Sequence, residues 1–486
     1  MNFKMMSRFF SLVCAAEAVF LSPAMGISIY DGTYQTTLGF CVALAVSLLL
    51  FLLFGLLSKN ASGALYAKEG FVCVSVSWIL MSLVGCLPFV VSGEIPRFVD
   101  ALFEIISGFT TTGASILNDV EALSRGALYW RSFSHWVGGM GVLVFLLAVA
   151  PADKKSAGFT IHLFRAESPG PEVGRLVPKL RQTAIFLYLT YIVLTVVNFI
   201  FLVFDMDVFE ALCTALGTAG TGGFGIKNDS LAGYSSYVQI VTTVFMFLFG
   251  INFSCYYLLF LRQFKSVFKD EELRLYFGIV IGSIILITVN LLTATDLYSN
   301  VGEALKHSSF TVTSLISTTG YSTANYELWP TFSKVILMIL MFTGACAGST
   351  CGSVKLARIM LLFKGLRRDI HKMIHPRQVQ SVRVNGNVVD ERVMANTSAY
   401  LSAYLVIFAV SLLLISLDGQ SLMTNISALL ACFNNIGPGF DAVGPTGNFS
   451  GFSDLSKIVL SFDMLAGRLE IFPLLLTFSR SVWKRT

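Results

Sequence analysis

Four short glycine-centred turns interrupt the apolar sequence of this chain. They are Thr110-Thr-Thr-Gly-Ala-Ser115, Gly220-Thr-Gly-Gly-Phe-Gly225, Thr318-Thr-Gly-Tyr-Ser322 and Asn434-Asn-Ile-Gly-Pro-Gly-Phe440. Each turn follows a short apolar segment and precedes a longer one. A hydrocarbon bilayer tolerates irregular backbone only where that backbone is buried in protein or lines a water-filled path. The four turns therefore indicate four copies of one unit, each of which contributes backbone to a single path.

Composition and hydropathy predict an all-α polytopic membrane protein. Hydrophobic residues make up 55% of the 486 residues and charged residues 13%, a balance that ordinary soluble domains do not show. A helix needs about 20 apolar residues to cross a bilayer. The stretches that meet this length, each expected to form one crossing, are 7–30, 36–58, 70–92, 127–150, 181–204, 233–262, 273–295, 331–362, 395–416 and 455–480.

The distribution of basic residues predicts the orientation of these crossings. Of the 34 lysines and arginines, 26 lie in the two termini and in the loops at 59–69, 151–181, 262–274 and 355–392. Cytoplasmic loops carry the excess of Lys and Arg, so both termini are expected in the cytoplasm. The four glycine turns then all fall on the extracytoplasmic half, although the turns played no part in placing the crossings.

The sequence offers no constellation typical of an enzyme or a cofactor site. The nine cysteines form no CxxC pair and have no histidine at ligand spacing, which favours small core residues over metal ligands or disulfides. The second turn matches GxGxxG, but that pattern indicates dinucleotide binding only between a strand and a helix. We therefore predict no catalytic residue, no cofactor in this chain and no nucleic-acid partner.

Each glycine turn is preceded by a segment too short to cross the membrane. These segments are 98–109, 206–217, 301–316 and 420–433. Three of them contain an acidic residue followed by Ala-Leu, at Asp100, Glu210 and Glu303, and an acidic residue suits a helix N-terminus. The central glycines are separated by 110, 97 and 117 residues, which is too long for a solenoid. The spacing predicts four tandem units about one axis.

The chemistry of such a unit suits a passing cation. A half-helix that enters from outside directs its partly negative C-terminal end toward the turn, and carbonyls of the turn can replace water around a cation. Glycine permits backbone conformations that a Cβ would block. The threonines at 110–112, 221 and 318–319 can bond nearby backbone and hold the turns rigid. In isolation, any one turn is better explained as a break between two crossings, but four turns in register favour the repeated pore unit.

Taken together, several segments resemble the Trk/Ktr/HKT superfamily of cation transporters, and most closely its bacterial TrkH-type potassium uptake branch. The segments are the four turns, His135-Trp-Val-Gly-Gly-Met-Gly141, Phe164-Arg-Ala-Glu-Ser-Pro-Gly-Pro171, Gly344-Ala-Cys-Ala-Gly-Ser-Thr-Cys-Gly352 and Gly467-Arg-Leu-Glu-Ile-Phe472. The resemblance covers the whole chain. It implies four membrane–pore–membrane repeats around one pore, with two extra helices in front. The expected boundaries are 1–66 for the extra helices and 67–165, 166–268, 269–385 and 386–486 for the repeats.

The resemblance also implies one selectivity filter built from the four turns, with K⁺ bound at the filter residues as the transported ion. The expected filter positions are Thr111, Thr112, Gly113, Gly222, Gly223, Thr318, Thr319, Gly320, Asn435, Ile436 and Gly437. Because glycine stands at all four central positions, the resemblance implies a preference for potassium. The fourth turn lacks threonine, so we expect a chemically asymmetric filter.

Two further features predict a gate below the filter. The first is a run of small residues, Gly344, Ala345, Cys346, Ala347, Gly348, Ser349, Thr350, Cys351 and Gly352. Small residues leave room for the backbone to bend, although close helix packing explains the run equally well. The resemblance implies an intramembrane loop that closes the pore, and we expect the gate here.

The second feature is Arg468, a cation inside the last apolar run. A charge within a crossing by default marks a functional site. A salt bridge to another helix is the structural alternative. The resemblance places this arginine in the pore below the filter, and we assign it to the gate.

The expected function is therefore that of a pore-forming subunit of a potassium uptake system in the bacterial inner membrane. The resemblance implies a homodimer and a cytoplasmic, nucleotide-binding, TrkA-like regulatory subunit. Alternatives left open are a transporter coupled to Na⁺ or H⁺, and a less selective Na⁺/K⁺ pathway.

Overall fold

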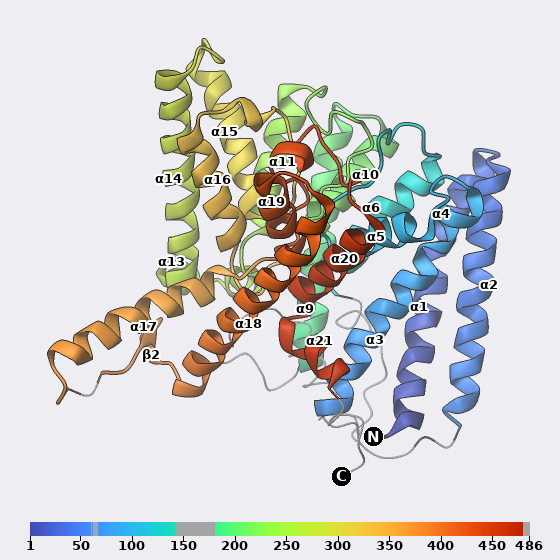
Figure 1. Ribbon diagram of the computed structural model, residues 1–486, viewed down its shortest axis with the longest axis horizontal. Coiled ribbons are helices and arrows are strands. Elements are labelled where there is room, and N and C mark those ends of the chain that lie inside the picture. The colour runs from blue at the N-terminus through green and yellow to red at the C-terminus, as the bar shows by residue number, and fades with distance from the viewer. Residues whose placement is uncertain (60, 62–66, 142–179, 379, 480–486) are drawn as a thin grey trace.

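The computed structural model describes residues 1–59, 61, 67–141, 180–378 and 380–479, and in these the chain is almost entirely helical (Figure 1). The only strands among these residues are β1 (Arg383–Val384) and β2 (Asn387–Val388), which form one short antiparallel hairpin. The predicted all-α polytopic membrane fold is confirmed. Helices α1 (Phe3–Tyr30) and α2 (Tyr34–Leu57) form an N-terminal pair at one edge of the molecule.

After this pair the chain repeats one order of elements four times: a long helix, a short helix, a glycine turn and a further helix. The elements in the first two copies are α3 (Ala67–Gly85), α4 (Leu87–Ser92), α5 (Phe98–Phe109), α6 (Arg125–Gly139), then α9 (Leu180–Val203), α10 (Val208–Gly220), α11 (Ser236–Phe249), α12 (Phe253–Phe260) and α13 (Phe264–Lys269). Those in the last two are α14 (Glu271–Ala294), α15 (Val301–Ile316), α16 (Thr331–Thr343), α17 (Leu356–Ile374), then α18 (Glu391–Ile415), α19 (Leu422–Phe433), α20 (Asp454–Arg468) and α21 (Ile471–Phe478). Short 3₁₀ turns at Tyr326–Leu328, Ser416–Asp418 and Asp441–Val443 complete the connections. The boundaries given above for the four units remain predictions.

Polar caps set where most of the pore helices begin. We use the name pore helices for α5, α10, α15 and α19. The side chains of Asp207, Asn300 and Ser421 accept backbone N–H bonds at the starts of α10, α15 and α19, which satisfies donors that the helix itself leaves free. The acidic residues do not lie in register, because Asp100 and Glu210 stand 13 residues before their glycines and Glu303 stands 17 before Gly320. Helix α15 is correspondingly longer, at 16 residues against 12 for α5.

The expected single crossings at 233–262 and 455–480 are wrong, whereas the break within 331–362 falls at the run of small residues where irregular backbone was expected. In the described part of the chain, six helices are long and apolar enough to cross, and a seventh candidate, α11 with α12, is bent by 88°. The expected crossings at 233–262, 331–362 and 455–480 are each interrupted, after Phe249, Thr343 and Arg468. Hydropathy does not register these breaks because the residues at them are mostly small or apolar. The crossing at 127–150 ends its described helix at Gly139, and residues 142–150 lie outside the described residues.

In each repeat, the helix that follows the glycine turn packs against the pore helix of the next repeat. The contacts join α6 to α10, α11 to α15, α16 to α19, and α20 back to α5. The four repeats are therefore arranged in a closed circle in the order of the sequence. The N-terminus, α13, α17, the hairpin and α21 lie toward one end of the molecule, while the α14–α15 connection lies at the other (Figure 1).

Candidate functional site

The four pore helices end in the same hydrogen-bonded turn. At each end a backbone N–H bonds the carbonyl five residues earlier, over N···O distances of 2.9 to 3.0 Å. The pairs are Thr112 with Ser107, Gly222 with Gly217, Thr319 with Ser314, and Ile436 with Ala431. This is the Schellman arrangement, which requires a left-handed residue just after the helix.

The left-handed residue is not glycine in any of these four turns. Thr111, Thr221, Thr318 and Asn435 have φ angles between +54° and +56°. Two residues later a glycine also has positive φ, at +80° for Gly113, +72° for Gly223, +85° for Gly320 and +98° for Gly437. The backbone thus follows one conformation four times, although the side chains of the fourth turn differ.

The four turns close into a ring, which we call the glycine ring. A Cβ built on each central glycine would collide with the carbonyl oxygen of the residue before the next glycine in sequence order. The distances are 2.0 Å from Gly113 to Gly222, 1.9 Å from Gly223 to Thr319, 2.1 Å from Gly320 to Ile436 and 2.9 Å from Gly437 to Thr112. The last contact returns to the first turn. The structure therefore brings all eleven predicted filter positions together at one place.

Hydrogen bonds between hydroxyl and amide side chains stabilise the turns of the ring. The Oγ1 atoms of Thr110 and Thr112 lie 2.8 Å apart, and Ser317 Oγ lies 2.7 Å from Thr319 Oγ1. Asn435 Nδ2 donates to Thr112 Oγ1 at 3.0 Å and so joins the fourth turn to the first. Within the described residues, no group of three His, Cys, Asp or Glu side chains could hold a metal ion. Carbonyl and hydroxyl oxygens are accordingly the acceptors that the described residues offer at the ring.

One carboxylate lies near the fourth turn. Asp441 directly follows Phe440 and is exposed. Hydrogen bonds from the Ser421 and Thr424 hydroxyls hold the pKa of the Asp441 carboxyl below its usual range. The group therefore keeps its negative charge at neutral and mildly acidic pH.

The small-residue run forms a non-helical segment between α16 and α17. Residues 344–355 contain positive φ angles at Gly344, Gly348, Ser353 and Lys355. The segment fits into the bend of the second repeat, because Cys346 N–H donates to Gly250 O at 3.2 Å and Phe253 N–H donates to Gly348 O at 3.0 Å. We call residues 344–355 the intramembrane loop.

The intramembrane loop touches the glycine ring directly. The N–H of Gly352 donates to Thr318 Oγ1 at 2.8 Å, which links the loop to the third turn. A Cβ on Gly352 would lie 2.5 Å from the carbonyl oxygen of Asn434 in the fourth turn. Gly352, the last residue of the predicted gate run 344–352, thus lies against two of the four turns.

Arg468 lies at the end of α20, and its guanidinium group donates hydrogen bonds to backbone carbonyls. Its Nη1 donates to Thr350 O at 2.7 Å, and its Nη2 donates to Gly138 O and Gly139 O at 2.6 Å each. The side chain is buried. It therefore connects the intramembrane loop to the end of α6. Glu470, two residues later, pairs instead with Arg358 of α17.

Comparisons with known proteins agree with this architecture. A family model described as TrkH, cation transport protein, matches residues 37–485. The chain belongs to the TrkH family of cation transport proteins. It is 33% identical over 493 residues to the Trk system potassium uptake protein TrkH of Escherichia coli (strain K12), with 100% of both chains covered. It is also 33% identical over 432 residues to the Trk system potassium uptake protein TrkG of the same strain, covering 88% of each.

A solved structure gives the same result in three dimensions. The crystal structure of the potassium transporter TrkH from Vibrio parahaemolyticus matches with a TM-score of 0.85 and 28% sequence identity, and the match covers 100% of both chains. Membership of the TrkH family, expected from the turns and the other distinctive segments, is confirmed. The relatives are transporters, which agrees with the expected absence of enzymatic chemistry.

Sequence reasoning missed a buried charged group beside the first two turns. Arg131 and Glu104 form an ion pair with an N···O distance of 2.8 Å, and their side chains are 2% and 0% exposed. Arg131 lies within the expected crossing 127–150, but near its start, where a cation is ordinary, so its position did not mark it as buried. His135, for which no role was expected, lies 2.8 Å through Nδ1 from Gly108 O.

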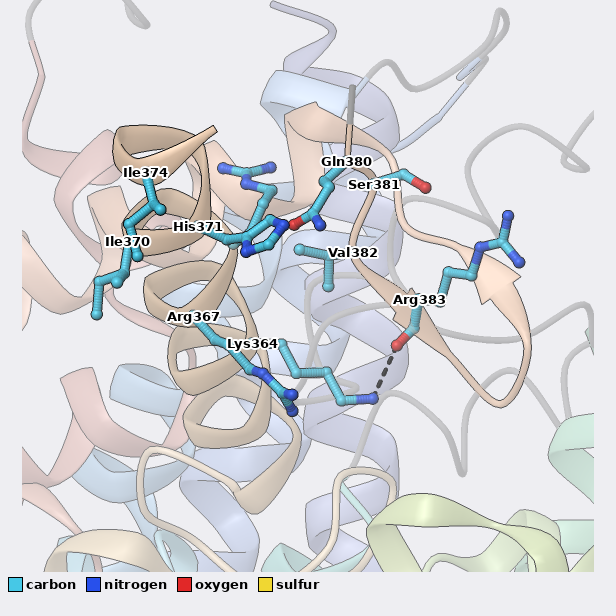
Figure 2. A pocket seen from close by; sticks show the side chains of 10 residues that line it. Lys364, Arg367, Ile370, His371, Ile374, Gln380, Ser381, Val382 and Arg383 are labelled. Atoms are coloured by element: carbon cyan, nitrogen blue, oxygen red, sulfur yellow. Dashed lines mark hydrogen bonds between the residues drawn. The ribbon is translucent and has the colours of Figure 1, made fainter. Parts of the chain in front are cut away.

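A basic cleft lies far from the ring, between α17 and the segment that leads into β1 (Figure 2). Its volume is about 710 Å³, and its lining includes Lys364, Arg367, Arg368, His371 and Arg383. Lys364 Nζ donates to Arg383 O at 2.7 Å across the cleft. The cleft belongs to the basic segment 355–392 that the charge distribution assigns to the cytoplasmic side.

Proposed function

We propose that this protein is the pore-forming subunit of a potassium uptake system, and that K⁺ passes through the glycine ring. The observation that carries the proposal is the closed contact of each central glycine with the carbonyl of the next turn. Relatives at 33% identity over the full length are named potassium uptake proteins. A ring with only carbonyl and hydroxyl oxygens suits a monovalent cation better than a divalent metal, which carboxylate ligands would hold.

The pore helices supply the electrostatic part of the mechanism. Each C-terminal end carries about half a negative charge, and all four helices end at the ring. Carbonyl oxygens replace water around the ion as it enters. Because the glycines leave no Cβ between neighbouring turns, the carbonyls can approach one another closely enough to surround one cation.

The intramembrane loop and Arg468 are proposed to form the gate. The loop lies against the third and fourth turns, and Arg468 holds the loop to the end of α6. A fixed positive charge next to the path opposes a passing cation, so both elements limit flow in the state described here. Opening then requires Thr350 to leave Arg468, or both to move together.

A proton-coupled mechanism remains the second candidate, and one observation favours it. Asp463 is fully buried in α20; its Oδ1 accepts a bond from Ser411 Oγ at 2.9 Å, while Oδ2 has no hydrogen-bond partner among the described residues. A carboxyl with one free oxygen can carry a proton. Proton coupling predicts that a K⁺ gradient drives H⁺ flux in proteoliposomes and that Asp463→Asn removes this flux. A passive pore shows no such flux.

We further propose that the basic cleft faces the cytoplasm and meets the acidic surface of a TrkA-like regulatory subunit, and that the subunit acts as a homodimer. Arg367 and Arg383 have no ion pair among the described residues, so they remain available to a partner. The relatives are named as proteins of a Trk system, and the word system implies more than one component.

Ion flux into liposomes that contain the purified protein tests the proposed function. K⁺ uptake should exceed Na⁺ uptake under matched gradients, and Gly223→Ala should abolish the difference because its Cβ would meet Thr319 O at 1.9 Å. Gly282→Ala in α14 is the matched control, since no atom lies within 4 Å of its Cβ. Equal K⁺ and Na⁺ uptake by the unmodified protein would contradict the proposal.

A further inference from the structure

We infer that Glu104, Arg131 and His135 form a clamp that fixes the first two turns against each other and thereby sets ion discrimination. The inference rests on the proposed function. All three residues belong to the first repeat, Glu104 in α5 and the other two in α6. They are positioning residues, because they hold the backbone of the turns rather than the ion.

The first part of the clamp is a buried, forked ion pair. Arg131 Nε and Nη2 lie 2.9 and 2.8 Å from Glu104 Oε1. Burial of two charges is favourable only when they pair closely and their remaining hydrogen-bonding groups are satisfied. Both conditions hold here, because each partner also binds the segment that follows a turn.

Glu104 holds the segment after the first turn. Its Oε2 accepts the N–H of Ile116 at 3.0 Å, and its Oε1 accepts the Ser115 hydroxyl at 2.9 Å. These residues stand two and three positions after Gly113 in the sequence. The carboxylate therefore fixes how the chain leaves the glycine ring in the first repeat.

Arg131 reaches across to the second turn. Its Nη1 donates to Gly225 O at 3.2 Å, and its guanidinium carbon lies 4.0 Å from the centroid of the Phe224 ring. A cation over an aromatic face is attracted to it. One ion pair thus fixes the chain after Gly113 and the chain after Gly223.

His135 adds a second link between the same two turns. Its Nε2 accepts the N–H of Phe224 at 3.2 Å, so Nδ1 carries the proton and donates to Gly108 O at the end of α5. A Cβ on Gly222 would lie 2.1 Å from His135 Nδ1. The neutral imidazole is therefore packed directly against the second turn.

At the other two turns the buried side-chain contacts are made by neutral groups. Ser314 Oγ donates to Tyr321 O at 2.6 Å, and Ser427 Oγ accepts the N–H of Phe440 at 2.9 Å. Tyr326 OH donates to Gly439 O at 2.9 Å and so joins the third repeat to the fourth. Among the described residues, the Glu327–Lys334 pair, whose side chains are each 25% exposed, reaches the fourth turn through the N–H of Asp441. The buried Glu104–Arg131 pair contacts the segments that follow the first and second turns. Loss of its charges should therefore change the spacing of one side of the ring and leave the other side intact.

The test measures the K⁺/Na⁺ permeability ratio of reconstituted protein. Glu104→Gln alone leaves a buried, unpaired arginine, so the main variant is the double substitution Glu104→Gln with Arg131→Gln, which removes both charges. Arg131→Lys is the second variant; it keeps the charges but cannot make the forked contact. The matched control is Asp100→Asn with Lys457→Met, which removes a partly buried ion pair of 2.6 Å at α5 that makes no contact with the turns in the described structure.

We expect the ratio to fall by about tenfold in the double variant, and less in Arg131→Lys, with K⁺ flux retained and the control ratio unchanged. A folded double variant with the unmodified ratio overturns the clamp, and so does an equal fall in the control. If the unmodified protein itself does not discriminate between the ions, the proposed function fails instead, and the two failures are thereby distinguished.

Discussion

At Gly113 two constraints coincide, and together they leave no alternative to glycine. Its φ angle is +80°, and a Cβ would lie 2.0 Å from Gly222 O. Gly93 has nearly the same φ angle, +78°, but no atom lies within 4 Å of its Cβ position. The comparison separates backbone strain, which both positions share, from contact between turns, which only the ring position has.

Gly113→Ser should therefore lower the K⁺/Na⁺ permeability ratio. The added atoms collide with Gly222 O and push the first turn away from the second. A cost of about 1–3 kcal/mol to the K⁺-bound ring corresponds to roughly five- to 150-fold in selectivity. Gly93→Ser introduces similar backbone strain and should leave the ratio unchanged. A retained ratio in Gly113→Ser, measured by reversal potentials, would show that the first turn does not take part in selection.

Arg468→Ala should raise K⁺ flux. The substitution removes three bonds to backbone carbonyls and the positive charge next to the intramembrane loop, and hydrogen bonds from charged groups contribute about 1.5–3 kcal/mol each. Arg97→Ala, which removes an exposed arginine paired with Asp454, serves as the control. Initial rates of K⁺ efflux from proteoliposomes measure the effect, and an unchanged or lower rate in folded Arg468→Ala would favour a purely structural role.

At the residue scale, the sequence predicts functional residues that a local pattern marks, and it misses side-chain pairs formed between distant segments. The central glycines follow from the turn pattern, and Arg468 follows from its position within an apolar run. Glu104 and Arg131 are 27 residues apart and on different helices, so no local pattern joins them. Arg131 also lies near the start of its expected crossing, where a cation is ordinary, and this concealed its burial.

At the scale of elements, the pore helices could be predicted and their common ending could not. Short length, flanking turns and acidic starts indicate half-helices. The Schellman ending uses Thr111, Thr221, Thr318 and Asn435 in left-handed conformations, where the usual residue is glycine. A rule that expects glycine there would shift the turn by two residues, onto the central glycines.

The interrupted second helices show the limit of hydropathy as a guide. Asn252, whose side chain caps α12, and Glu470, with φ of +63°, mark two of the breaks. Both residues have apolar neighbours in the sequence, so hydropathy averaged over a window stays high across them. Only the run of small residues at 344–352 gave a signal strong enough to predict irregular backbone.

Gly352→Ala should raise resting K⁺ flux with little change in ion preference. The methyl group would lie 2.5 Å from Asn434 O, so the intramembrane loop has to move away from the fourth turn. Gly278→Ala in α14, where no atom lies within 4 Å, controls for a change from glycine to alanine. Stopped-flow K⁺ flux provides the measurement, and equal flux in the two variants would argue against the loop as a barrier.

For the whole molecule, the number of repeats could be counted from the sequence, but their closed arrangement could not. Four glycines at similar spacing allow a row as well as a ring. The ring follows from contacts between successive turns, and from the packing of α6, α11, α16 and α20 against the pore helix of the next repeat. Packing at that distance leaves no periodic pattern in the sequence.

The charge distribution makes a prediction at this scale about orientation. A cysteine at Lys372, on α17, should react with a membrane-impermeant thiol reagent only after cells are permeabilised, because basic segments remain in the cytoplasm. A cysteine at Thr446, in the exposed connection after the fourth turn, should react in intact cells. Reaction of both in intact cells would contradict the proposed orientation, and the unmodified chain supplies the background labelling.

The central claim is that one ring of four glycine turns selects potassium. The most direct measurement is the reversal potential of the purified, unmodified protein in a planar bilayer with K⁺ on one side and Na⁺ on the other. The account predicts a potential close to that of a K⁺-selective pathway, shifted toward zero by Gly113→Ser. A reversal potential near zero for the unmodified protein would contradict it.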